Sequence, residues 1–311
     1  MNRTFAVGIG VLAAVAAGCV PAAPRATDDV TARPLRVTTT VGMITDAVRE
    51  VGGARVAVTG LMGPGIDPHL YKPTASDVIA LGDADLILYG GLHLEGRMVE
   101  LFEHIADGGT ATVAATRDIP PGSLRHPPAF EGAPDPHVWF DVALWQSAVH
   151  TIAAALAARD PGSTALYTAN RDRYMAELEA LDAWVDGQAN TVPTAQRILI
   201  TAHDAFGYFG DRYGFDVRGI QGISTASEAS ASDIQSLADL IAERQLKAVF
   251  VESSVPPATV EALKAAVASR GWRVAIGPAL FSDALGEPGA PAGTYVGMVR
   301  HNVTAIVEAL R

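Results

Sequence analysis

The tripeptide Asp-Pro-His occurs twice in this chain, at residues 67–69 and 135–137. Proline fixes its own backbone φ and pushes the preceding residue toward extended conformations, so each tripeptide predicts a stiff loop that presents an imidazole beside a carboxylate. A third histidine lies in segment 201–204, directly after the apolar run 198–200, and an aspartate lies in the late loop 281–283. Three imidazoles and one carboxylate would complete a set of ligands for one metal ion. The candidate ligands are His69, His137, His203 and Asp283.

Each candidate also has a structural interpretation, because a lone histidine is usually packed in a core or solvated. The repeated motif favours the ligand interpretation for His69 and His137. His203 is followed by Asp204, and this pair could also be a catalytic base with its orienting acid, or a helix N-cap. Asp283 lies in a Ser-Asp loop flanked by Gly and Pro, which is ordinary turn chemistry as well. On local grounds the role of Asp283 stays open.

Other residues near these motifs have supporting roles in this interpretation. Aromatic side chains beside the histidines are expected to exclude water: Tyr71, Trp139 and Phe140. Ligating histidines commonly donate their second ring N–H to an acceptor. Capping or solvation explains each possible acceptor equally well. The candidate acceptors are Asp67, Asp135, Asp141, Asp204 and Glu252. His126 could be an auxiliary ligand, although a solvated loop residue is favoured. The histidines read as structural are His93, His104, His150 and His301.

Length and composition restrict the class of protein. The chain has 311 residues, of which 49% are hydrophobic and 18% charged, which is typical of a globular protein with two lobes. The 34 acidic residues outnumber the 23 basic ones, which argues against nucleic acid as a partner and is compatible with a cation as ligand.

The first 19 residues resemble an export signal. Arg3 precedes an uncharged run, 5–18, that is too short to span a bilayer and ends in small residues. Cys19 is the only cysteine, and its position is similar to a bacterial lipobox, in which the thiol carries a lipid anchor. The alternative is an ordinary secretory signal with an incidental cysteine. Either way we expect an extracytoplasmic protein, at the periplasm or cell surface, with residues 20–34 as a flexible tether.

After the tether, strand-type and helix-type segments alternate, which predicts an α/β fold with mostly parallel sheets. We expect two lobes, 35–160 and 193–311, each with a four-stranded sheet flanked by helices. Residues 161–192 are predicted to form a long connecting helix, and a helix packed within one lobe is the equal alternative. The predicted strands are 35–40, 55–59, 86–89, 110–114, 197–201, 217–220, 248–252 and 273–276. The predicted helices outside the connection are 43–51, 74–82, 95–105, 206–213, 230–244 and 257–269.

All four candidate ligands follow the carboxyl end of a predicted strand. In open α/β sheets ligands bind in the crevice outside these ends, so two facing lobes would each bring two candidates to one cleft. His69 and His137 come from the N-terminal half, and His203 and Asp283 come from the C-terminal half.

Taken together, the motifs are similar to those of the metal-binding lipoprotein receptors of bacterial ABC importers, the zinc/manganese solute-binding protein family. The resemblance extends from about residue 35 to the C-terminus and rests on the segments 65–71, 135–139, 201–206, 222–225, 228–230 and 281–283. It implies two lobes bridged by a long helix, one divalent metal in the cleft as cargo, and delivery to a membrane permease with its ATPase. The ligands that it implies are His69, His137, His203 and Asp283.

The resemblance and the ligand chemistry point to different metals. Three imidazoles and the Irving–Williams order favour Zn²⁺ over Mn²⁺. Zinc-dedicated relatives often carry a long histidine-rich run before the second histidine, whereas loop 118–134 holds only His126, and manganese relatives frequently have Glu in place of His203. We favour manganese as the physiological cargo, with zinc also bound. Protonation of the imidazoles below pH ~6 is expected to weaken binding.

Two functions other than metal transport are alternatives for these residues. An exported zinc-dependent hydrolase could use the same four residues, but four protein ligands leave no open position for water, and no His-Glu-x-x-His or nucleophile-elbow motif is present. A surface adhesin could coexist with metal capture, and no adhesive repeat supports it. We therefore expect a binding protein and not an enzyme, acting as a monomer with a metal ion and a permease as partners, and with the membrane only through its anchor.

Overall fold

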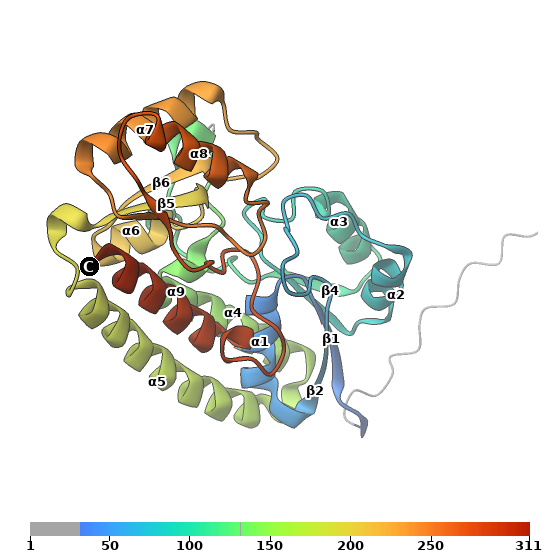
Figure 1. Cartoon of the computed structure of the whole chain (residues 1–311). Helices are drawn as coiled ribbons and strands as arrows, with labels where there is room; N and C mark the ends of the chain where they lie inside the picture. Colours follow the sequence, from blue (N-terminus) through green and yellow to red (C-terminus); the bar gives the residue numbers. More distant parts are fainter. Residues whose placement is uncertain (1–31, 131) are drawn as a thin grey trace, which may run out of the picture.

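The computed structural model describes residues 32–130 and 132–311 (Figure 1). The predicted signal peptide, Cys19 and the first part of the tether lie outside the described residues. Within the part of the chain that is described, no helix combines the length and the apolar character needed to cross a membrane.

The N-terminal half contains one parallel sheet of four strands in the order β2-β1-β3-β4. These strands are β1 (Leu35–Thr39), β2 (Val56–Gly60), β3 (Leu86–Tyr89) and β4 (Ala111–Ala114). The crossover helices are α1 (Gly42–Gly52), α2 (Ala75–Asp83) and α3 (Val99–Asp107). The apolar residues of β1 and β3 are buried, as expected for central strands of a parallel sheet covered on both faces. The sheet leaves the carboxyl ends of its strands on one edge, where the loops that carry ligands begin.

In the C-terminal half the four strands form two parallel pairs. The strands are β5 (Ile198–His203), β6 (Asp216–Gln221), β7 (Ala248–Val249) and β8 (Ala275–Ile276). The helices around them are α6 (Gly207–Tyr213), α7 (Ala231–Arg244) and α8 (Ala258–Ala268). A backbone hydrogen bond of 2.9 Å from Phe250 N to Ile200 O joins the pairs. The α/β class is confirmed, whereas the second lobe has paired strands in place of a regular four-stranded sheet.

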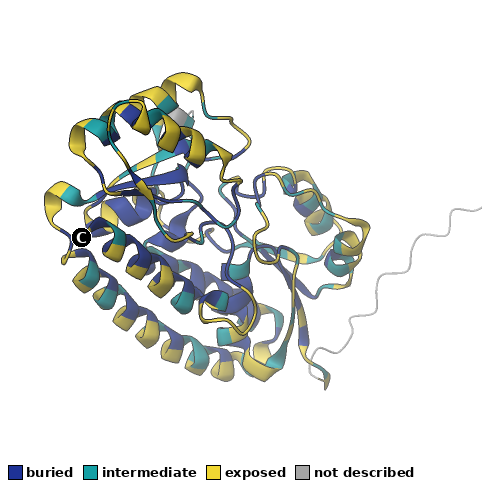
Figure 2. Cartoon of the chain, viewed as in Figure 1, coloured by how far each residue is buried: buried dark blue, intermediate teal, exposed yellow. Residues whose placement is uncertain are grey.

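The strand β5 is buried along its whole length because both of its faces are covered (Figure 2). Alternate side chains of a strand point to opposite faces, and here they belong to two different cores. Leu199 packs into the large core that extends through the N-terminal half, while Ile198 and Ile200 pack into a smaller core with α7 and α8. This double burial fixes the register of β5 and therefore the position of the histidine at its end.

Three long helices support both halves: α4 (Val142–Arg159), α5 (Thr164–Ala189) and α9 (Tyr295–Leu310). The chain turns between α4 and α5 at a short 3-10 segment, Pro161–Ser163, whose first residue is a proline and so suits the start of a helical turn. The 26-residue helix α5 lies along α4 and α1 and also along α9 (Figure 1). The helix α5 therefore packs against helices of both halves and also connects them. The proposed boundaries 35–160, 161–192 and 193–311 stay predictions.

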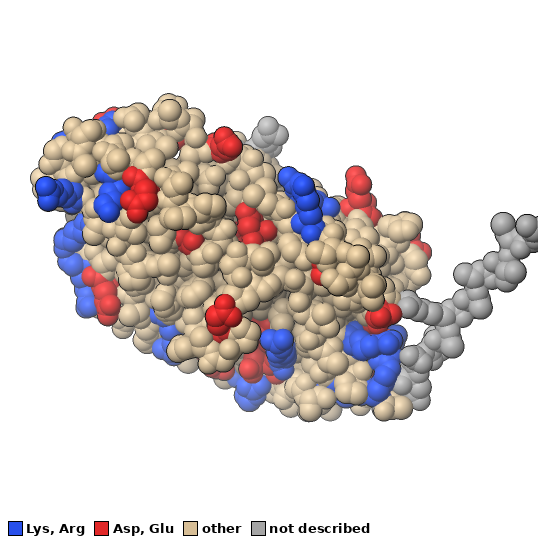
Figure 3. All heavy atoms as spheres, turned by 45° about the vertical axis from the view of Figure 1, so that its right-hand side comes forward, with Lys and Arg blue, Asp and Glu red and all other residues tan. Residues whose placement is uncertain are grey.

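The remaining short helical segments are single 3-10 turns in the connections. They are Gly53–Arg55, Pro121–Ser123, Pro128–Phe130, Val138–Phe140, Thr194–Gln196 and Pro291–Gly293. Acidic and basic side chains are interspersed on the face shown in Figure 3. Exposed ion pairs of this kind contribute little to stability, so the two cores hold the fold together.

Candidate metal centre

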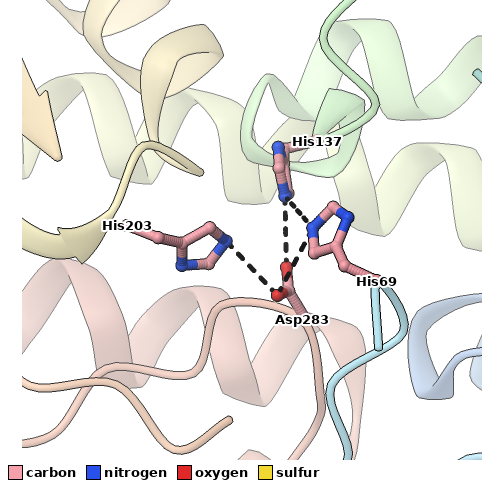
Figure 4. Close-up of side chains that lie close together, drawn as sticks. All are labelled: His69, His137, His203 and Asp283. Carbon is pink, nitrogen blue, oxygen red and sulfur yellow. Dashed lines mark hydrogen bonds and ion pairs between the residues drawn. The ribbon is translucent and has the colours of Figure 1, made fainter. Parts of the chain in front are cut away.

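The structure brings all four candidate residues together (Figure 4). One nitrogen from each of the three imidazoles and one oxygen of Asp283 lie within 4.8 Å of one another. The Nε2 atoms of His69 and His137 are 3.3 Å apart, and Nε2 of His203 is 3.3 Å from Asp283 Oδ2. Exposure is 6% for His69, 0% for His137 and His203, and 1% for Asp283. It is the only such cluster of His, Cys, Asp and Glu among the described residues.

Two residues of the cluster come from each half of the chain, as the topology predicted. His69 lies in the loop after β2, and His137 lies in the longer connection after β4 and precedes the 3-10 turn Val138–Phe140. Asp283 lies in the loop after β8. His203 differs slightly from expectation, because β5 extends past Thr201 and ends at His203, which pairs with Gln221 of β6. The side chain of His203 is thus held by the sheet itself.

The two Asp-Pro-His tripeptides form the same turn. Oδ1 of Asp67 accepts the backbone N–H of His69 at 2.8 Å, and Oδ1 of Asp135 accepts that of His137 at 3.0 Å. An aspartate that accepts the N–H two residues ahead forms an Asx-turn. The proline between them has no N–H that needs a partner. The repeated sequence therefore fixes each histidine backbone locally.

Two of the three imidazoles also donate to a buried carboxylate. Nδ1 of His137 is 2.8 Å from Asp135 Oδ1, and Nδ1 of His203 is 2.5 Å from Glu252 Oε2. Both pairings leave Nε2 facing the centre of the cluster, which fixes the tautomer that can bind a metal. Among the described residues, no carboxylate or carbonyl accepts a hydrogen bond from Nδ1 of His69.

The other carboxylates that the sequence offered have different roles. Asp141 accepts the N–H of Leu144 at 3.0 Å and caps the N-terminus of α4. Asp67 contacts the His69 backbone and the hydroxyl of Thr225, at 2.6 Å, but not the imidazole. Asp204 makes no side-chain hydrogen bond to any of the three imidazoles in the described structure. Only Asp135 and Glu252 therefore act as imidazole acceptors.

Of the three aromatic residues, Trp139 lies against the site. Its ring contacts His137 edge to face at a centroid distance of 5.2 Å, and its Nε1 donates to Ser282 O at 3.0 Å. Phe140 instead stacks on Phe206, and the Tyr71 hydroxyl donates to Asp77 in the first turn of α2. Trp139 thus connects the His137 segment to the Asp283 segment, which fits the expectation that it excludes water from the site.

The remaining histidines stay outside the cluster, as expected. His126, the possible auxiliary ligand, is exposed and its Nδ1 lies 2.9 Å from Gly132 O. His301 bonds Ala279 O at 2.9 Å through Nε2. His93, which was interpreted as a turn residue, has a positive φ of 64°.

The imidazoles differ in their electrostatic environment. Burial lowers the pKa of His69 to about 3. Burial also disfavours the charged form of His137, but hydrogen bonds to Asp135 and Asp283 outweigh it and raise the pKa of His137 to about 9. Burial also favours the neutral form of His203. The charges of Glu252 and Asp283 outweigh this effect and hold the pKa of His203 well above its ordinary value. His69 is therefore neutral at physiological pH, whereas His137 and His203 hold protons that a metal would replace.

Asp283 is an anion in this setting. Its burial favours the neutral acid, but the charges and hydrogen bonding of His203 and His137 hold the pKa of Asp283 well below its usual range. Both of its carboxylate oxygens, and Nε2 of His203, are buried without a hydrogen bond of good geometry. Such unsatisfied atoms are costly unless a ligand binds them. A cation at the centre of the cluster would satisfy all of them.

Sequence reasoning missed two residues that hold this site. Arg125 lies 3.5 Å from Asp135 Oδ2, and Thr225 donates to Asp67. Both act on the aspartates of the Asp-Pro-His turns and come from distant parts of the chain. Thr225 belongs to the Gly-Ile-Ser-Thr segment on which the resemblance rests, but no local pattern indicates what either side chain contacts.

An α/β fold with a buried cluster of three histidines and one aspartate, two from each half of the chain, has the donor set of a metal-binding site. Comparison with known proteins agrees. The chain belongs to the family described as zinc-uptake complex component A, periplasmic, whose profile matches residues 37–309. This family and its relatives are substrate-binding proteins of transporters and not enzymes, so the hydrolase alternative is not supported.

Individual relatives match most of the chain. The zinc-binding protein TroA of Treponema pallidum (strain Nichols) is 52% identical over 279 residues, which are 89% of this chain and 89% of TroA. The manganese-binding lipoprotein MntA of Bacillus subtilis (strain 168) is 45% identical over 278 residues, which are 89% of this chain and 90% of MntA. The solved structure of the periplasmic zinc-binding protein TroA from Treponema pallidum matches with a TM-score of 0.87 and 51% identity, covering 89% of this chain and 99% of that chain.

Proposed function

We propose that this protein captures one divalent transition-metal ion outside the cytoplasm and delivers it to an ABC permease. His69, His137, His203 and Asp283 are the proposed ligands. The observation that carries the proposal is the buried cluster in which four potential ligand atoms lie within 4.8 Å of one another, while neither Asp283 oxygen has a hydrogen bond of good geometry. A folded protein tolerates such a group when a cation completes it.

The spacing of the ligand atoms fits a single ion. Ligand atoms about 2.0–2.1 Å from a tetrahedral zinc ion are about 3.3 Å from one another. The separations here are 3.3 Å for His137 Nε2 to Asp283 Oδ1, 3.3 Å for His203 Nε2 to Asp283 Oδ2 and 3.9 Å for His69 Nε2 to Asp283 Oδ2. The cluster is thus preorganised, and capture requires only small adjustments.

Manganese is the physiological cargo that we favour, with zinc bound as well. Asp283 turns both oxygens toward the imidazoles, Oδ1 to His137 and Oδ2 to His203 (Figure 4). A carboxylate in this position can bind through both oxygens and raise the coordination number above four, which suits manganese better than zinc. The single histidine of loop 118–134 supports the same choice. Zinc retains the higher affinity for three imidazoles.

Elemental analysis tests the binding site. Protein purified without added metal should contain one ion per chain, and the His69→Ala variant should contain none after dialysis against a chelator. A His126→Ala variant is the matched control, because His126 is exposed and outside the cluster, and it should retain the ion. Equal metal content in His69→Ala and the parent protein would refute the assignment.

Competition uptake of radiolabelled metals tests the cargo and its delivery. Cells that lack this gene should lose manganese import at low external concentrations, and the restored gene should recover it. Loss of zinc import alone would overturn the manganese assignment, and unchanged import of both metals would overturn delivery to a permease.

The proposed location is the outer face of the cytoplasmic membrane or the periplasm, with a lipid on Cys19 and the protein a monomer. The small residues before Cys19 support this part of the proposal. A Cys19→Ala variant should release the protein from the membrane fraction and lose labelling by a radioactive fatty acid. Retention of both properties would rule out the anchor.

A further inference from the structure

Arg125 links the loop before the second Asp-Pro-His turn to the first helix after His203. The half-buried guanidinium donates through Nη1 to Gly207 O at 2.8 Å and pairs with the exposed Asp211, both on α6. Its Nε faces Asp135 Oδ2 at 3.5 Å. The residue is further fixed by its backbone, since Arg125 N donates to the hydroxyl of Tyr208 at 3.1 Å and Arg125 O accepts from Asp135 N at 2.9 Å.

Asp135 is completely buried and has two different oxygens. Oδ1 accepts both the backbone N–H and the Nδ1–H of His137, whereas Oδ2 makes no hydrogen bond at all. Arg125 is the only cation that forms an ion pair with Oδ2 among the described residues. A buried carboxylate is costly without a compensating charge, and when a metal holds His137 in its neutral form the imidazole cannot supply that charge.

We propose that Arg125 is a positioning residue that strengthens metal binding through Asp135, by holding the carboxylate in the place from which it accepts the Nδ1–H of His137. The inference rests on the proposed function and identifies how its affinity is set. Arg125 does not touch the cluster itself. Its effect is indirect, because a well-placed carboxylate acceptor on Nδ1 makes the Nε2 lone pair of His137 a better ligand and holds the ring in place.

The residues of α6 around the guanidinium leave room for an arginine at position 125. A Cβ atom added to Gly207 would lie 2.7 Å from the guanidinium carbon of Arg125, so glycine leaves the space in which the group lies. The guanidinium also lies over the ring of Tyr208 at 5.8 Å, and the hydroxyl of Tyr208 donates to Asp135 O at 2.9 Å. A planar, permanently charged group suits this position better than the ammonium of lysine.

The same contacts connect metal binding to the relative position of the two halves. Arg125 belongs to the N-terminal half, whereas Gly207 and Asp211 belong to a helix of the C-terminal half that begins four residues after His203. A displacement of α6 away from this loop would withdraw the guanidinium from Asp135. Metal would then dissociate faster even while His137 remains in place.

The test measures zinc affinity and the rate of zinc transfer to a colorimetric chelator for the purified full chain. Arg125→Ala should weaken affinity about tenfold and accelerate transfer, and Arg125→Lys should fall between Arg125→Ala and the parent protein. Arg117→Ala is the matched control, because Arg117 lies in the same connection but pairs with the exposed Asp118. It should behave like the parent protein. Thermal unfolding confirms that each variant is folded.

A double-mutant cycle separates positioning from a general structural role. In an Asp135→Asn background the Arg125→Ala change should have almost no further effect, because its route to the metal is already lost. An Arg125→Ala variant with unchanged zinc affinity and transfer rate would overturn the inference. So would an Arg125→Ala effect that adds in full to that of Asp135→Asn. A parent protein that binds no metal would instead refute the proposed function itself.

Discussion

The two Asp-Pro-His turns have the same sequence and the same backbone hydrogen bond, yet they hold their imidazoles differently. In the turn at 135–137 the aspartate binds both the backbone and the ring of its histidine, and its second oxygen faces Arg125. In the turn at 67–69 the aspartate binds only the backbone, and its second oxygen accepts from Thr225. One histidine is therefore fixed through its ring and the other only through its main chain.

This difference shows that an identical tripeptide acquires its chemical character from distant partners. The ring of His137 is held by charge, and its pKa rises to about 9, whereas burial lowers the pKa of His69 to about 3. His69 offers a free lone pair at once, while His137 must first release a proton. The cluster thus combines one proposed ligand that is already neutral, His69, with others that must lose a proton before a metal can bind and that therefore bind it more weakly at low pH.

Among single substitutions, removal of a histidine ring should have the largest effect. A structural metal site gains about 10–16 kcal/mol from four ligands, so one ligand is worth roughly 3 kcal/mol, or about 100-fold in affinity. His137→Ala should lower zinc affinity more than His69→Ala, because it also leaves Asp135 buried without its imidazole partner. Competition titration against a chelator measures both. Equal losses of affinity in the two variants would show that the contact between His137 and Asp135 adds nothing to the contribution of the ring.

Acidification should weaken binding through two of the rings and not through the third. His137 and His203 have raised pKa values, so a metal displaces a proton from each, and affinity falls as pH falls. His69, with a pKa of about 3, stays neutral down to pH 5 and contributes nothing to this dependence. With two protons displaced per ion, affinity should fall about 100-fold per pH unit, or about 10,000-fold between pH 7 and pH 5.

Calorimetry in buffers of different ionisation enthalpy counts the protons released. About two protons per zinc ion are expected at pH 6, one from each raised imidazole. Release of three protons would mean that His69 titrates like the others and would remove the contrast between the turns. A flat affinity between pH 7 and pH 5 would contradict the assignment of the imidazoles as ligands altogether.

Neutralising the two aspartates compares the turns directly. Asp135→Asn should lower zinc affinity about 10- to 100-fold, because it removes the carboxylate that accepts the Nδ1–H of His137, a proposed ligand. Asp67→Asn keeps an acceptor for the His69 backbone and should cost less than about tenfold. The affinities of both variants and the parent protein are measured side by side. A larger effect at Asp67 would reverse the proposed ranking.

The smallest effect is expected at the hydrogen bond that joins the His69 turn to the C-terminal half. Thr225→Val keeps the shape of the side chain but removes the hydroxyl that donates to Asp67 at 2.6 Å. The loss is about 1 kcal/mol, which corresponds to about fivefold faster zinc dissociation. Stopped-flow transfer to a chelator measures it. Ser224→Ala is the control, since Ser224 directly precedes Thr225 and its hydroxyl accepts the N–H of Ala226 rather than contacting Asp67 in the described structure.

The sequence predicted the residues of the cluster because two regularities coincide there. The repeated tripeptide singled out His69 and His137, and the rule that ligands gather beyond the carboxyl ends of parallel strands explained why His203 would join them. Asp283 had no local signal of its own and depended on the resemblance. The α/β alternation was likewise readable, because strand-type and helix-type segments differ in length and in β-branched content.

The partners of the cluster could not be ranked from sequence because they are set by tertiary contacts. Glu252 reaches His203 across 49 positions through the neighbouring strand segments, and nothing local distinguishes it from Asp141, which caps a helix. The strand β7 ends at Val249, before the predicted residue 252, for a related reason. Pro278 has no N–H to donate, so the pairing of this edge is interrupted between Gly277 and Leu280, which both still donate to the neighbouring segment.

The edge-to-face contact between Trp139 and His137 provides the molecule with an optical signal. Of the four tryptophans in the chain, it is the one whose ring is in contact with a ring of the cluster within the described residues. A protonated imidazole quenches indole emission, and a paramagnetic ion does so by a different route. Emission from Trp139 should therefore brighten when a diamagnetic ion expels the proton and stay dim when manganese does, so that occupancy and the kind of occupant can be followed in real time without any label.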